Sequence, residues 1–175
     1  MKKPIEEAAI IYNSRTQDFG LLSKAFLYSA TIEEILEFMS NLKTIDKFSF
    51  LLRDHLITKS KNGDFKKIGV KISKMFIWKA KSDDSALRGY FSKLLLEIFP
   101  ILSSQYQNTL FSHWVMSERP IDRIRGYNSF IWVKSNNTSE SLIYESYRKY
   151  GDRRAFIQLM MNGTPSKLNS IFKLK

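Results

Sequence analysis

Apolar side chains recur along most of the chain at the spacing of an α-helix. Ile32, Ile35, Leu36 and Met39 fall on one predicted helix face, because positions three and four residues apart lie one above another. The sequence has no run in which Val, Ile and Thr alternate with polar residues, the pattern typical of strands. These observations predict an all-α fold.

Capping residues and helix breakers indicate where the helices begin and end. Thr31 precedes Glu34 at the spacing of a capping box, and Asp83 or Asp84 and Pro120 suit the starts of later helices. We expect helices over residues 4–12, 18–28, from 31, from 44 to the 59–63 turn, 64–79, 84–99, 104–116, 120–134, 140–149 and 152–161, with a short one at the end. No long linker interrupts this series, so residues 1–175 are expected to form a single domain.

One segment of the chain matches another without gaps. Residues 87–95 align with residues 124–132, and both segments contain Arg-Gly-Tyr followed two positions later by Ser. A repeat of nearly forty residues indicates stacked helical hairpins. Gly89 and Gly126 lie inside the matched helices, where each costs about 1 kcal/mol relative to Ala, so both are interpreted as sites of close helix packing.

The segment from Asp84 to Arg88, with the apolar residues that follow it, resembles the second helix of HEAT-type repeats over about half of the chain. In that family an Asp near the turn and an Arg within the helix commonly bond between neighbouring repeats. In the second copy Ile121 stands at the aspartate position and Asp122 is displaced by one residue. The resemblance implies a short HEAT-like helical-repeat stack, an α-solenoid, and an irregular helical bundle is the alternative.

The charge of the chain favours an acidic partner. Twenty-eight Lys and Arg residues against 17 Asp and Glu give a formal charge of +11. Cysteine is absent, which excludes a disulfide framework, a thiolate metal site and a cysteine nucleophile. The longest apolar run, residues 94–102, is about half of a membrane span, and no signal-peptide pattern follows Met1. We therefore expect a cytoplasmic protein that does not bind membranes.

Lysines form the first candidate binding site. Lys67, Lys71 and Lys74 follow helical spacing on one predicted face, and Lys66 precedes them. A row of ammonium groups of this kind can follow a phosphate backbone and release its counterions. A solvated helix face is the alternative interpretation.

Arginines and tyrosines form the second candidate binding site. It comprises Arg119, Arg123, Tyr147, Arg148, Arg153 and Arg154. The planar guanidinium group suits two-pronged binding of carboxylate or phosphate, whereas Arg88 and Arg125 are interpreted as structural. Tyr147 lies among phenols and cations on one predicted helix, a mixture compatible with single-stranded nucleic acid and equally with a protein-binding ridge.

Residue patterns typical of enzymes are weak. The two histidines stand far apart, and neither begins a metal-binding motif, so no cofactor and no metal are expected. The three tryptophans, Trp78, Trp114 and Trp132, are expected in the core. Some DNA glycosylases have HEAT-like scaffolds with a cleft Trp and Asp, so Trp114 and Asp122 form a remote catalytic alternative.

The sequence thus favours a non-enzymatic α-helical binding module with a basic, aromatic-containing face. Its expected partner is the backbone of a nucleic acid, DNA or RNA, which we favour slightly over an acidic protein. The alternative function is that of a protein-binding adaptor, inhibitor or immunity-type factor.

Overall fold

The computed structural model describes residues 4–14, 19–61, 69–133 and 137–173, and the side chains of residues 4–14, 22–59, 72–133 and 138–169. All regular structure in these ranges is helical, which confirms the all-α prediction. Packing divides the chain into two compact units, Met1–Ile101 (unit 1) and Leu102–Lys175 (unit 2). The expectation of a single domain stays a prediction.

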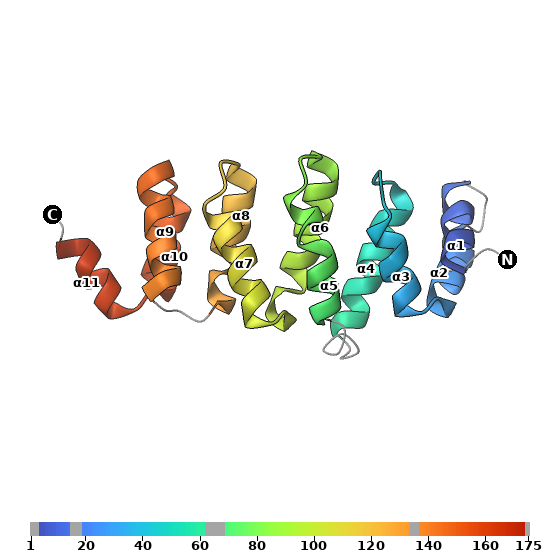
Figure 1. Cartoon of the computed structure of the whole chain (residues 1–175), viewed down its shortest axis with the longest axis horizontal. Coiled ribbons are helices and arrows are strands. Elements are labelled where there is room, and N and C mark those ends of the chain that lie inside the picture. The colour runs from blue at the N-terminus through green and yellow to red at the C-terminus, as the bar shows by residue number, and fades with distance from the viewer. Residues whose placement is uncertain (1–3, 15–18, 62–68, 134–136, 174–175) are drawn as a thin grey trace. The chain divides into compact units, whose positions relative to one another are not determined.

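Unit 1 consists of helices that pack in sequential pairs (Figure 1). They are α1 (Pro4–Asn13), α2 (Phe19–Ser29), α3 (Ile32–Ser40), α4 (Lys47–Lys61), α5 (Gly69–Phe76) and α6 (Ser85–Glu97), with short 3-10 helices η2 (Lys79–Lys81) and η3 (Phe99–Ile101). α1 packs on α2 and α5 packs on α6, while α3 contacts both α1 and α5, and α4 contacts α6. α1 also contacts α4, so within this unit helices that are not consecutive in the sequence lie next to each other.

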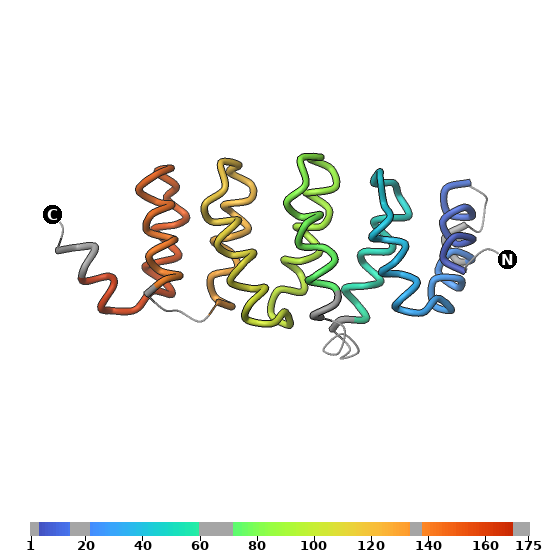
Figure 2. The backbone as a smooth tube through the Cα atoms, in the orientation of Figure 1, coloured from blue at the N-terminus to red at the C-terminus, as the bar shows by residue number. Residues whose placement is uncertain are grey.

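Unit 2 has the same pairing of consecutive helices (Figure 2). Its elements are α7 (Ser104–Val115), α8 (Pro120–Ser129), the 3-10 helix η4 (Phe130–Trp132), α9 (Asn137–Tyr150), α10 (Arg153–Asn162) and α11 (Pro165–Lys173). α7 packs on α8 and α9 on α10, while α7 also contacts α9 and α8 contacts α10. The HEAT-like stack and the irregular bundle both stay predictions, because neither follows from these contacts alone.

The predicted helix starts are confirmed by their hydrogen bonds. Thr31 Oγ1 accepts a hydrogen bond from the Glu34 backbone N–H, and Glu34 Oε2 accepts one from the Thr31 backbone N–H. Asp84 Oδ1 accepts hydrogen bonds from the first backbone N–H groups of α6, and Pro120 stands in the first turn of α8.

Two predicted core tryptophans are exposed. Trp114 is fully buried as expected, but 73% of Trp78 and 50% of Trp132 is exposed to solvent. Each exposed tryptophan lies beyond the last residue of an α-helix, since α5 ends at Phe76 and α8 at Ser129. Helical periodicity assigns a residue to a face only while the helix continues, and the predicted helices over 64–79 and 120–134 extended too far.

The two glycines of the matched segments have different surroundings. A Cβ added at Gly126 would lie 2.7 Å from both Val115 Cγ2 and the Val115 backbone nitrogen, which confirms close packing there. At Gly89 no atom outside its own helix lies within 4 Å among the described residues, so the packing interpretation is wrong for this glycine.

Two arginines fix the turns that precede α6 and α8 in the same way. Arg88 Nη1 donates hydrogen bonds to the carbonyls of Ser82 and Asp83, at 2.8 and 3.0 Å. Arg123 Nη1 donates to the carbonyls of Ser117 and Glu118, at 3.1 and 3.0 Å. By these hydrogen bonds Arg88 corresponds to Arg123, whereas in the match between residues 87–95 and 124–132 it corresponds to Arg125.

Candidate functional site

Hydrogen bonds bring two turns of unit 2 together. Lys149 Nζ, near the end of α9, donates to Glu118 Oε1 in the α7–α8 turn over 2.8 Å. The Tyr150 hydroxyl donates to the Met116 carbonyl and lies 3.2 Å from the same Glu118 oxygen. The α7–α8 and α9–α10 turns, at the upper end of this unit in Figure 1, therefore form one surface, here called the turn end.

Arg123 holds this surface together from inside. Only 6% of Arg123 is exposed, and its Nε donates to Asp152 Oδ2 over 2.6 Å, while its guanidinium carbon lies 4.0 Å from the centroid of the Tyr150 ring. Burial alone would lower the pKa of Arg123, but the hydrogen bond and charge of Asp152 outweigh it and raise this pKa. Arg123 is one of the predicted partner-binding residues, but burial and internal bonding leave it no surface for a partner.

Asp152 is engaged from a second side. The Tyr127 hydroxyl donates to Asp152 Oδ2 over 3.1 Å, and its oxygen lies 2.8 Å from Ser146 Oγ. Ser146 Oγ in turn donates to the Val115 carbonyl. Burial raises the pKa of Tyr127, so the phenol stays protonated and keeps donating at neutral pH. The carboxylate of Asp152 is thus occupied by groups of its own unit.

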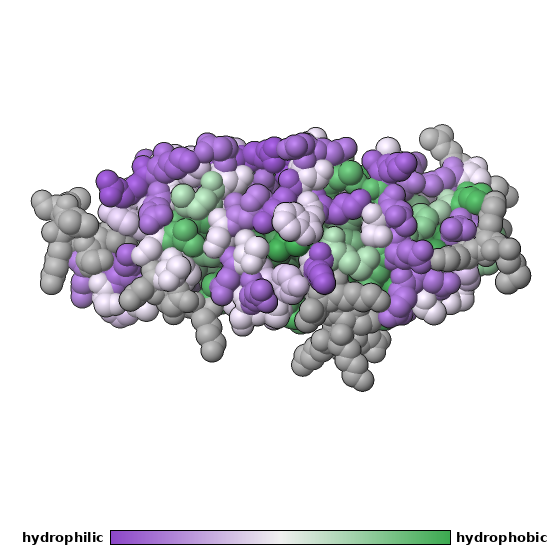
Figure 3. All heavy atoms as spheres, viewed as in Figure 1, coloured by the Kyte–Doolittle hydropathy of each residue, from purple (hydrophilic) through white to green (hydrophobic). Residues whose placement is uncertain are grey.

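The remaining predicted arginines are exposed at the turn end. They are Arg119, Arg148, Arg153 and Arg154, here called the turn-end arginine cluster. Arg119 caps the start of α8, Arg148 lies in the last turn of α9, and the other two open α10. Within the part of the chain that the structure describes, none of the four side chains has an ion pair or hydrogen bond. Hydrophilic side chains line the upper edge of this unit (Figure 3).

Tyr147, which precedes Arg148 on α9, is half-buried, and so is Tyr144, three residues earlier on the same helix. The Tyr147 ring packs against Phe156 with centroids 5.5 Å apart, so one part of this predicted binding residue is used to join α9 to α10. The Tyr144 ring lies 5.9 Å from Lys167 Nζ. The structure therefore brings Tyr147 to the same region as the arginines without leaving its ring fully open.

Apolar side chains that were not predicted as part of a binding site lie on α10. Ile157, Met160 and Met161 are exposed, Met161 to 74%. They follow Arg153 at spacings of four, seven and eight residues, which places all of them on one face of the helix. The helical spacing of these apolar residues is the signal in the sequence from which this exposed face could have been predicted.

The lysine site lies largely outside the described residues. Lys66 and Lys67 belong to the range 62–68, and the Lys71 side chain is also outside the description, although its backbone is part of α5. Lys74 is described and is exposed. The lysine row therefore stays a prediction.

The geometry gives the remote catalytic pair no access to a substrate. Trp114 is fully buried, and only 1% of Asp122 is exposed. Asp122 Oδ1 accepts a hydrogen bond from Arg125 Nη1 over 2.5 Å, so Arg125 is structural as expected.

Among the residues described, His, Asp and Glu form no group suited to hold a metal ion. No described helix is both long and apolar enough to span a membrane.

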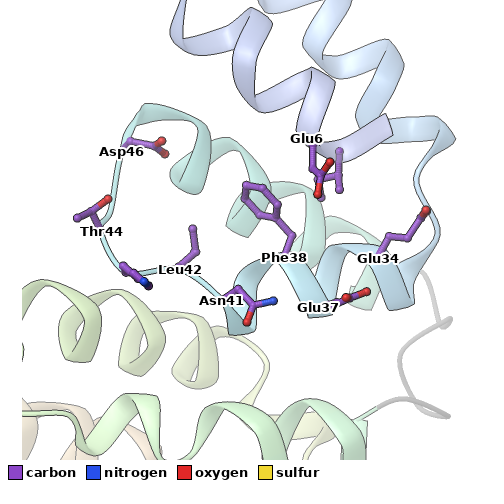
Figure 4. Close-up of a pocket in the computed structure, with 10 residues that line it drawn as sticks. Glu6, Glu34, Glu37, Phe38, Asn41, Leu42, Thr44 and Asp46 are labelled. Atoms are coloured by element: carbon purple, nitrogen blue, oxygen red, sulfur yellow. The ribbon is translucent and has the colours of Figure 1, made fainter. Parts of the chain in front are cut away.

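A hollow of about 340 Å³ in unit 1 has the opposite charge to the turn end (Figure 4). Glu6, Glu37 and Asp46 line it around the ring of Phe38. Burial alone would raise the pKa of Asp46, but hydrogen bonds from Ser49 and the Asn13 amide outweigh it and lower this pKa. The carboxylate of Asp46 therefore has a structural role at the start of α4.

No protein-family model matches the sequence, and comparisons with characterised proteins and with solved structures give no match. The resemblance to HEAT-type repeats therefore rests on the residues quoted for it. The Arg123–Asp152 contact is of the kind that this resemblance implies between neighbouring repeats, and the family relationship itself stays a prediction.

Proposed function

We propose that this protein is a non-enzymatic helical binding module that holds a polyanion, with a nucleic-acid backbone as the favoured partner. The observation that carries the proposal is the turn-end arginine cluster, whose four exposed guanidinium groups have no acidic partner in the described part of the chain. Two neighbouring carboxylates are engaged by other cations, because Glu118 bonds to Lys149 and Asp152 bonds to Arg123.

The chemistry of arginine supports a phosphate partner. A guanidinium group binds two phosphate oxygens at once with charge-assisted hydrogen bonds. Each neutralised phosphate also releases counterions, so affinity is expected to fall steeply as salt concentration rises. Because these contacts read the backbone and not the bases, binding should depend little on sequence.

A charge-neutralising variant tests the cluster. We expect the triple change Arg148→Gln, Arg153→Gln and Arg154→Gln to weaken binding of labelled DNA and RNA, measured by fluorescence anisotropy across a salt series. The slope of log K against log salt should become shallower by about 1 for each phosphate that the variant no longer neutralises. The control with the same net charge changes Lys24, Lys47 and Lys93 to Gln, since these lysines are exposed in unit 1. Equal weakening in both variants would mean that net charge alone drives binding.

An acidic protein is the second candidate partner, because Ile157, Met160 and Met161 are exposed beside Arg153 and Arg154 on α10. Protein interfaces combine apolar anchors with arginine in this way. If this partner is correct, Met161→Ser should weaken the complex as strongly as Arg154→Gln does. For a nucleic-acid backbone, the same methionine change should leave affinity unaltered.

A further inference from the structure

Trp78 is a large aromatic residue that unit 1 leaves mostly in solvent. Its exposed fraction is 73%, although burial of an indole is among the larger single contributions to a hydrophobic core. Its backbone has helical dihedral angles, φ −71° and ψ −37°, two residues after the end of α5. Trp78 therefore combines a helical backbone conformation with a side chain that lies mostly in solvent.

Two lysines accompany this indole. Lys81 Nζ lies 5.5 Å from the centroid of the Trp78 ring, a cation–π distance. Lys74 is exposed and lies four positions before Trp78 in the sequence, in the last turn of α5. Lys79 is engaged elsewhere, because its Nζ donates to the Leu42 carbonyl. The indole therefore has one cation over its ring, Lys81, and a second exposed lysine, Lys74, close to it in the sequence.

The isolation of Trp78 distinguishes this surface from a protein-binding patch. In the described parts of α5 and α6, and in η2 between them, no other large apolar side chain is exposed. A protein partner usually requires a contiguous apolar area, whereas a nucleotide base requires one aromatic face with a cation within reach of its phosphate. A single exposed indole with the Lys81 ammonium group over its ring satisfies the second requirement.

We propose that Trp78, Lys74 and Lys81 form a stacking site for an unpaired base and its phosphates in single-stranded nucleic acid. This proposal rests on the function proposed above and adds a second site with its own substrate class, single strands. Bases in a duplex are already stacked on each other, so a duplex can contact the lysines but not the indole.

Intrinsic fluorescence tests the stacking directly. In a Trp132→Phe chain the remaining tryptophans are Trp78 and the buried Trp114, so quenching by a ligand reports on Trp78. We expect oligo(dT) to quench this fluorescence to saturation. Heparin, which has the charge but no bases, should compete for binding without comparable quenching.

The affinity of Trp78 variants for oligo(dT) then distinguishes the contribution of base stacking from that of charge. Trp78→Ala should raise the Kd about fivefold or more, and Trp78→Phe should raise it less, because base–aromatic stacking is sequence-tolerant but needs a ring. The matched control is Trp132→Ala, a half-exposed tryptophan of unit 2 over which no described cation lies, and its Kd should equal that of the unchanged chain. Circular dichroism verifies that each variant remains helical.

The outcomes distinguish the two proposals. If oligo(dT) binds but Trp78→Ala leaves the Kd unchanged, or if heparin quenches equally, the stacking site is wrong and the proposed function stands. If duplex DNA binds but oligo(dT) does not, the stacking site is likewise wrong and the proposed function stands. If neither nucleic acid binds even at low salt, both proposals are overturned.

Discussion

Arg123 in α8 and Asp152 at the start of α10 form an ion pair with its nitrogen and oxygen 2.6 Å apart. The pair joins two consecutive helical pairs of unit 2, because α7 and α8 stand on one side of it and α9 and α10 on the other. Since Arg123 is buried, Asp152 compensates a positive charge that water cannot solvate.

We expect Asp152→Ala to destabilise the protein by about 3 kcal/mol, because it leaves a buried guanidinium without its counter-charge. The free energy of unfolding in urea measures this decrease. Glu118→Gln is the control, since its ion pair with Lys149 is exposed and its removal should leave the unfolding midpoint in place. A similar effect of both changes would contradict a special role of the buried pair.

The two glycines of the matched segments should respond to alanine with opposite signs. Gly126→Ala should destabilise the protein by about 1–3 kcal/mol, since its Cβ would overlap Val115. Gly89→Ala should stabilise it by about 1 kcal/mol, because the methyl group meets open space and alanine favours a helix. Chemical denaturation of the two variants side by side measures both effects, and a shared sign would refute the structural distinction.

His55 is expected to make unit 1 sensitive to mild acid. Its Nε2 is buried without a hydrogen-bond partner in the described residues, and burial, aided by the charge of Lys59, lowers the pKa of His55 below 6.5. The unfolded chain therefore takes up a proton before the folded chain does, and stability decreases as pH falls from 6.5 to the folded-state pKa. Thermal unfolding should show this slope in the unchanged protein and not in His55→Leu. An identical slope in both would assign it to another group.

Asp46 should contribute to stability at lower pH. Because its pKa is below the ordinary value of 3.8, the ionised form stabilises the folded state above pH 3.8, and this contribution is lost as pH falls through the folded-state pKa. Asp46→Asn should therefore be less stable than the unchanged protein at neutral pH, and the two should converge in strong acid. Acid titration followed by circular dichroism measures this convergence.

Local signals in the sequence were sufficient to predict that the chain is helical and where several helices begin. They were not sufficient to predict which side chains are exposed. The capping box of Thr31 and Glu34 involves neighbours in the chain, so spacing alone predicted it. The burial of Arg123 depends on Asp152, 29 residues away, and no local pattern indicates that pairing. Exposure of Trp78 depends on where α5 ends, and helix ends are the part of a prediction that periodicity determines least. The class of fold and the structural roles of Arg88 and Arg125 were therefore predictable, whereas the burial of Arg123 was not.

The arginine bonds to the turns before α6 and α8 also restrict how the chain can change in length. Arg88 and Arg123 each reach the carbonyls five and six positions earlier, so an inserted residue between donor and acceptor would separate them. Insertions and deletions should therefore be rejected within residues 82–88 and 117–123, although surface turns usually tolerate them. A grafted peptide or tag should therefore be inserted outside these two ranges.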